Sequence, residues 1–180
     1  LRMSRGLGDV YKRQLCILDS LSIIRLHQGK VSDVCEDIEQ IDFQRPEVKE
    51  GFRLYRESLQ FMALTVRPVF LYTLEHVEKE YLEKLRHGFI QLLNENQSER
   101  CFKLALEFIV ERCPSAAVRE CYTRLAEFLV WGYPFALYRI RKQHLHKEYT
   151  QMVRKSAELL ENDDWEGYAD SWKALMEYEQ

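Results

Sequence analysis

The side chains best able to bind a metal or catalyse a reaction are scattered along this sequence. Two of its five histidines, His144 and His146, are two positions apart, which on a helix directs them to different faces. The five cysteines include no Cys-x-x-Cys pair. Glycine-rich phosphate loops and nucleophile-elbow motifs do not occur either. These patterns predict that the chain is not an enzyme and holds neither a metal nor a cofactor.

A cluster of cations is the more specific chemical signal. Arg139, Arg141 and Lys142 fall within one turn of an expected helix and are followed by further basic residues. This cluster is either a solvated basic face or a docking site for a phosphate-bearing ligand. The aromatic residues just before it are Trp131, Tyr133, Phe135 and Tyr138. They fit a helical core and equally the wall of a ligand cavity inside a bundle.

A second basic group lies near the front of the chain, in the stretch IRLHQGKVSDV at 24–34. Two short runs rich in Ile, Leu and Val flank Gln28-Gly29, which predicts a two-stranded hairpin over 23–35 with glycine supplying a positive φ. Arg25, His27 and Lys30 would lie around its tip. Side chains of these types reach phosphates and base edges of nucleic acids.

Almost everything else has helical periodicity. The chain has 180 residues, of which 46% are apolar and 31% charged, and its net charge of −3 restricts any nucleic-acid contact to a local surface. Apolar residues recur at helical spacing from residue 47 onward, with Pro68 in the first turn of a second helix and a cap at Asp163-Asp164. We predict an all-α fold, an antiparallel bundle of about seven helices with the hairpin in front of it. No apolar run is long enough to span a membrane, and reduced cysteines suit a cytoplasmic protein.

The chain divides into four predicted segments. Residues 1–14 resemble a translated sequencing adapter rather than native protein and are left out of the fold prediction. Residues 15–35 end in the hairpin, 36–46 form an acidic linker, and 47–180 form the helical domain. If 1–14 are not native, the protein began further upstream.

The order of these features resembles the GntR family of bacterial transcriptional regulators, and within it the FadR branch. HQGKVSDV is similar to that branch's wing, which has a His-Gly-Lys tip. The distance from Val34 to Thr65-Val66-Arg67 matches the family's spacing to its own Ser-Val-Arg. The stretches FKLALEFIVERCPSAAV at 102–118 and KSAELLENDDWEGYADSW at 155–172 look like later helices of the family's effector domain. The resemblance covers roughly residues 17–178.

This resemblance implies a homodimeric regulator whose winged helix-turn-helix binds operator DNA and whose helical domain binds an effector. Many relatives hold a metal in that domain, but this chain has Arg100, Leu104 and residues 172–174 at the matching places, which are not ligands. The long-chain acyl-CoA branch is therefore favoured. In this chain only the wing of the DNA-binding domain remains, and the recognition helix is missing. The implied DNA contacts are Arg25, His27, Gln28, Gly29 and Lys30.

An acyl-CoA effector would need an apolar channel with cations at its mouth. The polar contacts that we predict are Arg67, Arg139, Arg141 and Lys142. The predicted apolar wall consists of Phe108, Trp131 and Tyr138. Because an arginine in an apolar run is costly without a partner, Arg67 meets either a ligand anion or a carboxylate such as that of Glu107.

Two other functions are compatible with the sequence. A regulator of the same family could sense a small organic acid, which predicts a compact polar pocket centred on Arg67. A helical protein-interaction adaptor, with no ligand and no DNA role, would instead expose a large apolar stripe.

Overall fold

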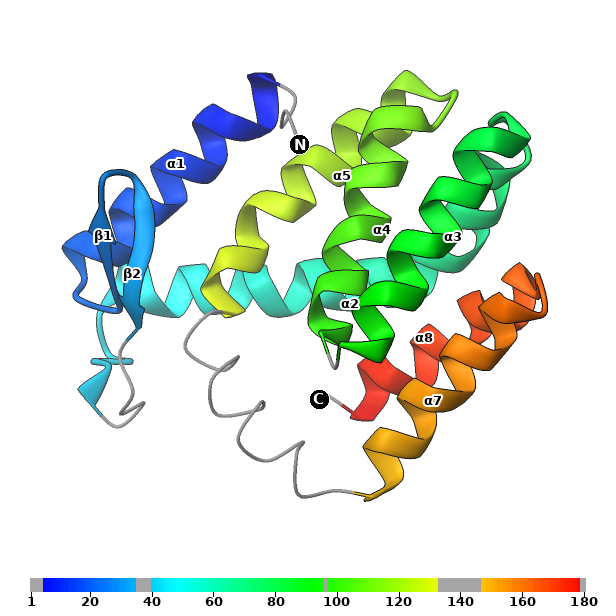
Figure 1. The fold of residues 1–180 in the computed structure, drawn as a ribbon. Coiled ribbons are helices and arrows are strands. Elements are labelled where there is room, and N and C mark those ends of the chain that lie inside the picture. Colours follow the sequence, from blue (N-terminus) through cyan, green and yellow to red (C-terminus); the bar gives the residue numbers. More distant parts are fainter. Residues whose placement is uncertain (1–4, 35–39, 96, 133–146, 179–180) are drawn as a thin grey trace. The chain divides into compact units, whose positions relative to one another are not determined.

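The computed structural model describes residues 5–34, 40–95, 97–132 and 147–178, and these are mostly helical (Figure 1). The front of the chain holds α1 (Arg5–Ser20) and the strands β1 (Ile24–His27) and β2 (Lys30–Val34). The helices that follow are α2 (Pro46–Leu74), α3 (Lys79–Asn94), α4 (Ser98–Arg112), α5 (Ala116–Phe128), the 3-10 helix η2 (Leu129–Gly132), α7 (Lys147–Glu161) and α8 (Trp165–Tyr178). Seven α-helices and one antiparallel hairpin within these ranges confirm the predicted helical class. None of these helices is long and apolar enough to cross a bilayer.

The chain forms two compact units. Unit 1 comprises Leu1–Met62 and Thr123–Lys142, and unit 2 comprises Ala63–Tyr122 and Gln143–Gln180. The predicted boundary at 36–46 separates the hairpin from the helical domain. In the structure, residues from the start of α2 and from η2 share one hydrophobic cluster with the hairpin. Residues 5–14, which were left out of the fold prediction, are part of α1.

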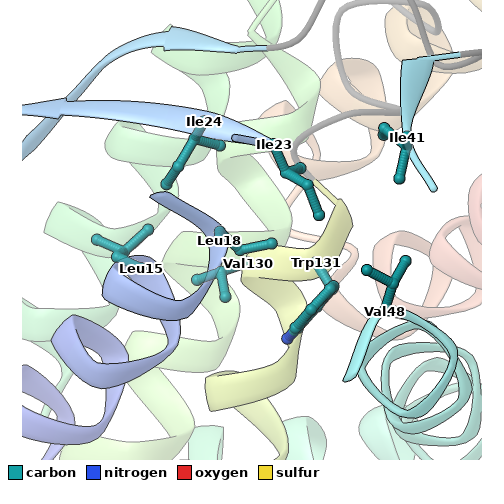
Figure 2. Packing of buried hydrophobic residues seen from close by; sticks show 8 residues of the cluster. All are labelled: Leu15, Leu18, Ile23, Ile24, Ile41, Val48, Val130 and Trp131. Carbon is teal, nitrogen blue, oxygen red and sulfur yellow. The ribbon is translucent and has the colours of Figure 1, made fainter. Parts of the chain in front are cut away.

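The core of unit 1 is built from five separate parts of the chain. Leu15 and Leu18 come from α1, Ile23 and Ile24 from the start of the hairpin, and Val48 from α2. Ile41, Val130 and Trp131 complete the cluster (Figure 2). Every one of these side chains is buried, so their packing fixes the hairpin against α1, α2 and η2.

Unit 2 packs α3 against α4 and α7, and α7 against α8 (Figure 1). Its core is dominated by aromatic rings. Phe70 of α2 is completely buried and lies among rings from α3, α4 and α8. These neighbours are Phe89, Phe108, Trp165, Tyr168 and Trp172. Aromatic side chains bury more apolar area than any other type, so this cluster is the main source of hydrophobic stabilisation in the unit.

The prediction that Pro68 lies in the first turn of a second helix is wrong, because α2 continues through Pro68. Proline removes one backbone N–H and its ring crowds the carbonyl one turn earlier. Here Pro68 and Leu64 both lie on the exposed side of the helix, where water can satisfy the freed carbonyl. On the opposite side Met62, Val66 and Phe70 are buried at helical spacing. Packing of that face maintains the helix across the proline.

Of the two residues in the cap predicted at Asp163-Asp164, Asp164 is the one that caps the helix. Asp164 Oδ1 accepts a hydrogen bond of 2.8 Å from the backbone N–H of Gly167, which makes Asp164 the N-cap of α8. Asp163 instead has a φ of +60° and ends the preceding helix. Its carboxylate accepts a hydrogen bond from Trp165 Nε1 at 3.0 Å.

Candidate functional site

The hairpin gathers the five residues predicted to contact DNA at one exposed tip. Gln28 and Gly29 form the two-residue turn, with φ values of +50° and +74°, as expected for a type I′ turn. His27 pairs with Lys30 across the strands, and Leu26 with Val31. The predicted two-stranded hairpin with Gly29 in its turn is therefore confirmed.

Alternation along β1 separates an apolar face from a basic one. Ile24 is buried and Leu26 half-buried, whereas Arg25 and His27 are exposed. An irregularity after Arg25 places Ser32 outside the regular ladder, and the Ser32 hydroxyl donates a hydrogen bond to the Arg25 carbonyl at 3.1 Å. The backbone N–H of Leu26 donates to Asp19 Oδ1 of α1 at 2.9 Å. Arg25 and His27 therefore face solvent, while the backbone of the same strand is hydrogen-bonded to α1 and its apolar side chains pack on the core.

Arg67 lies on the surface of unit 2 and not in an apolar interior. Its Nε atom donates to Asp170 Oδ1 of α8 at 2.5 Å. This hydrogen bond raises the pKa of Arg67 and lowers the pKa of Asp170. Glu107, the partner considered from sequence, instead lies 3.9 Å from Lys103 Nζ. Arg67 therefore has a carboxylate partner within the protein, as one of the two expectations held, but this partner is Asp170 and not Glu107.

The residues predicted to form the apolar wall are divided between the two units. Phe108 is buried in unit 2, with its ring centroid 5.5 Å from that of Phe70. Trp131 is buried in the core of unit 1. Tyr138 and the basic cluster Arg139, Arg141 and Lys142 lie outside the described residues, so these predictions stay predictions.

Tyr168 is a candidate ligand contact that the sequence analysis missed. Its side chain is only 1% exposed, between Phe89 and Trp172 in unit 2. Its hydroxyl forms no hydrogen bond within the part of the chain that the structure describes. Burial raises the pKa of Tyr168 well above its ordinary value, so the group stays a neutral donor. The signal available in the sequence was the helical spacing of Trp165, Tyr168 and Trp172, which also fits an ordinary core.

The described residues hold no group of three or more His, Cys, Asp or Glu side chains placed to bind a metal ion. Comparison of the chain with protein-family models, with curated proteins and with solved structures gives no match. Two local features remain as candidate binding sites, the basic hairpin tip of unit 1 and the buried Tyr168 hydroxyl of unit 2.

Proposed function

We propose that this chain is part of a GntR-like transcriptional regulator of the FadR branch, with the hairpin as its DNA-contacting wing. The observation that carries the proposal is the hairpin itself, with a tight turn and an exposed basic tip above a buried apolar face. A small tip can approach a groove closely, and Arg25 and Lys30 can meet phosphates while His27 and Gln28 reach base edges. The rest of the protein would be a homodimeric, FadR-type helical effector domain.

The wing can be tested with duplex DNA and isotope-labelled protein. We expect weak, salt-sensitive binding, with a Kd of about 10⁻⁴ to 10⁻⁶ M, because a wing alone lacks major-groove readout. Amide resonances of residues 25–32 should shift on titration. The double variant Arg25→Gln/Lys30→Gln should lower the slope of log K against log salt by about 0.9 for each lost phosphate contact.

The matched control is Lys84→Gln/Lys103→Gln, which removes two exposed charges of unit 2. It should leave the salt slope unchanged. Shifts confined to other residues would contradict the wing. Tight, sequence-specific binding would show that the chain contains a DNA-reading surface besides the hairpin.

We further propose that unit 2 binds a long-chain acyl-CoA as effector. Two observations support an apolar ligand with a polar group in this unit. Its interior is packed with aromatic rings around Phe70 and Phe108, and the Tyr168 hydroxyl is buried there without a hydrogen-bond partner among the described residues. A buried donor of this kind gains a hydrogen bond when a ligand acceptor reaches it.

Calorimetry separates this proposal from its alternatives. A long-chain acyl-CoA, free CoA and a dicarboxylate are each titrated into the full chain. We expect binding heat that grows with acyl length and weakens in Arg67→Ala. Arg53→Ala is the control for Arg67→Ala, since Arg53 is also an exposed arginine of α2 and is paired with Glu50 and Glu57. It should bind like the wild type.

The other outcomes identify the remaining candidates. Binding of the dicarboxylate alone would favour a sensor of small organic acids. No heat from any ligand would favour the interaction adaptor, for which α2 offers exposed apolar side chains at Leu64 and Tyr72.

A further inference from the structure

The hairpin owes part of its core to a segment far downstream. Val130 and Trp131 of η2 are 3% and 2% exposed and share one cluster with Leu18 of α1 and Ile24 of β1 (Figure 2). Leu26 and Val31, the inward side chains near the tip, pack against the same cluster. The apolar face of the hairpin and the side chains of η2 therefore belong to one core.

Trp131 occupies a seat that only glycine allows. A Cβ atom on Gly51 of α2 would lie 2.3 Å from Cε2 and Cζ2 of the indole, which no side chain could tolerate without movement. Phe52 meets the same ring edge to face, with centroids 5.4 Å apart. The indole Nε1 donates to Gln14 Oε1 at 3.1 Å. The ring is thus held against the helix backbone, with its polar atom satisfied.

This seat joins two elements of low intrinsic stability. A two-stranded hairpin is marginal in water unless another surface covers its apolar face. A single 3-10 turn has poorer hydrogen-bond geometry than an α-helix and is stable mainly through its side-chain packing. Segments of this kind open locally at a lower free energy than the whole protein unfolds.

We propose that Trp131 in the Gly51 seat is a latch that sets the order of the hairpin. When the indole is docked, the apolar face of the hairpin is covered and the basic tip is fixed. When it is undocked, Ile24 and Leu26 lose their cover and the hairpin loses its order. Trp131 lies in η2, which follows α5 directly in the chain. The consequence for DNA contact rests on the proposed function.

Hydrogen exchange followed by NMR tests the latch on the full chain. Gly51→Ala places a methyl group in the seat. We expect exchange of hairpin amides and of the Trp131 indole N–H to accelerate roughly tenfold or more, while amides of residues 79–112 keep their wild-type rates. The control is Gly88→Ala in α3, where the added Cβ would be 3.5 Å from Leu104 Cδ2, an ordinary contact. Hairpin exchange should be unchanged there.

A second-site variant keeps the test decisive. Gly51→Ala/Trp131→Phe replaces the indole with a smaller ring and should restore part of the hairpin protection. If Gly51→Ala does not fold, exchange of the hairpin amides in Trp131→Phe alone is compared with exchange of the amides of residues 79–112. The latch would be overturned if, in Gly51→Ala, the hairpin amides exchanged at wild-type rates while exchange of the Trp131 indole N–H was accelerated. Equal loss of protection in 79–112 would also overturn it, because the molecule would then open as one unit. None of these readouts uses DNA, so the latch can hold even if the wing proposal fails.

Discussion

Replacing Phe70 with alanine is expected to lower the free energy of unfolding by about 3–5 kcal/mol. Phe70 has no exposed surface, and its ring centroid lies 4.6 Å from that of Trp172 and 5.5 Å from that of Phe108. The rings around it come from three different helices, so the cavity left by the truncation cannot close by rotation of one side chain. The cost therefore includes both lost transfer energy and an unfilled volume.

Urea denaturation followed by circular dichroism measures this change. Phe61→Ala is the matched control, since Phe61 is the same residue type on the same helix but is 43% exposed. It should cost about 1 kcal/mol or less. Equal losses in the two variants would show that the interior of unit 2 is not packed as described. Fluorescence and dichroism transitions must coincide before either value is interpreted as a two-state free energy.

Local sequence signals were sufficient to predict the hairpin. The turn needs two residues with positive φ, and both Gln28 and Gly29 adopt it. Glycine does so without steric cost, which makes Gly29 the signal for the position of the turn. The alternation of apolar and polar residues then determines which side of β1 is buried, because side chains in a strand alternate between faces. Both signals lie within a few residues of the structure that they predict.

The α2 helix shows how packing overrides a local signal. Pro68 favours a helix start when considered alone. The helix continues through Pro68 because Val66 and Phe70, on either side of the proline, both belong to one buried face. The apolar residues before and after Pro68 keep one helical spacing in the sequence. The proline is the stronger local signal, so it led to the prediction of a helix start.

Long-range partners were the least predictable part of the candidate site. Trp131 was expected beside a ligand in the helical domain, yet it packs on Gly51 and Gln14. Arg67 was expected to meet a ligand or Glu107, yet Asp170 is its partner. No periodicity within a helix indicates which distant residue a side chain will meet, so these contacts required the tertiary structure.

Tyr168→Phe is expected to stabilise the ligand-free protein by about 1–3 kcal/mol. The substitution removes a buried hydroxyl that has no hydrogen-bond partner within the described residues, and leaving such a group unsatisfied costs this much. The Cys101 thiol and the Trp172 indole both act on the pKa of this hydroxyl. A thiol is only a weak hydrogen-bond partner, so it offers little compensation.

Tyr122→Phe is the matched control and should change stability in the opposite direction. Tyr122 is also buried in unit 2, but its hydroxyl is 2.9 Å from Thr65 Oγ1. Loss of that hydrogen bond should cost about 0.5–1.5 kcal/mol. Thermal or urea denaturation of the two variants at neutral pH provides the comparison. Destabilisation by both substitutions would show that the Tyr168 hydroxyl already has a partner in the ligand-free protein.

The same hydroxyl links stability to alkaline pH. Burial raises the pKa of Tyr168 well above the value of about 10 for an unfolded chain, and it raises the pKa of Tyr122 to about 12. Above about pH 10 the unfolded chain therefore binds fewer protons than the native one, so the free energy of unfolding falls as pH rises. Tyr168→Phe should make this fall shallower, because phenylalanine has no proton to lose.

The change in acyl-CoA affinity caused by Tyr168→Phe shows whether the Tyr168 hydroxyl contacts the effector. If the hydroxyl donates to an effector, Tyr168→Phe weakens acyl-CoA binding because the complex loses a hydrogen bond. The same substitution stabilises the ligand-free protein, in which the wild-type hydroxyl has no partner among the described residues. A hydroxyl with no part in binding would leave the affinity unchanged while the stability still rises. Parallel calorimetric titrations of the wild type, Tyr168→Phe and Tyr122→Phe distinguish these results. Unchanged affinity in Tyr168→Phe would remove this residue from the proposed effector site.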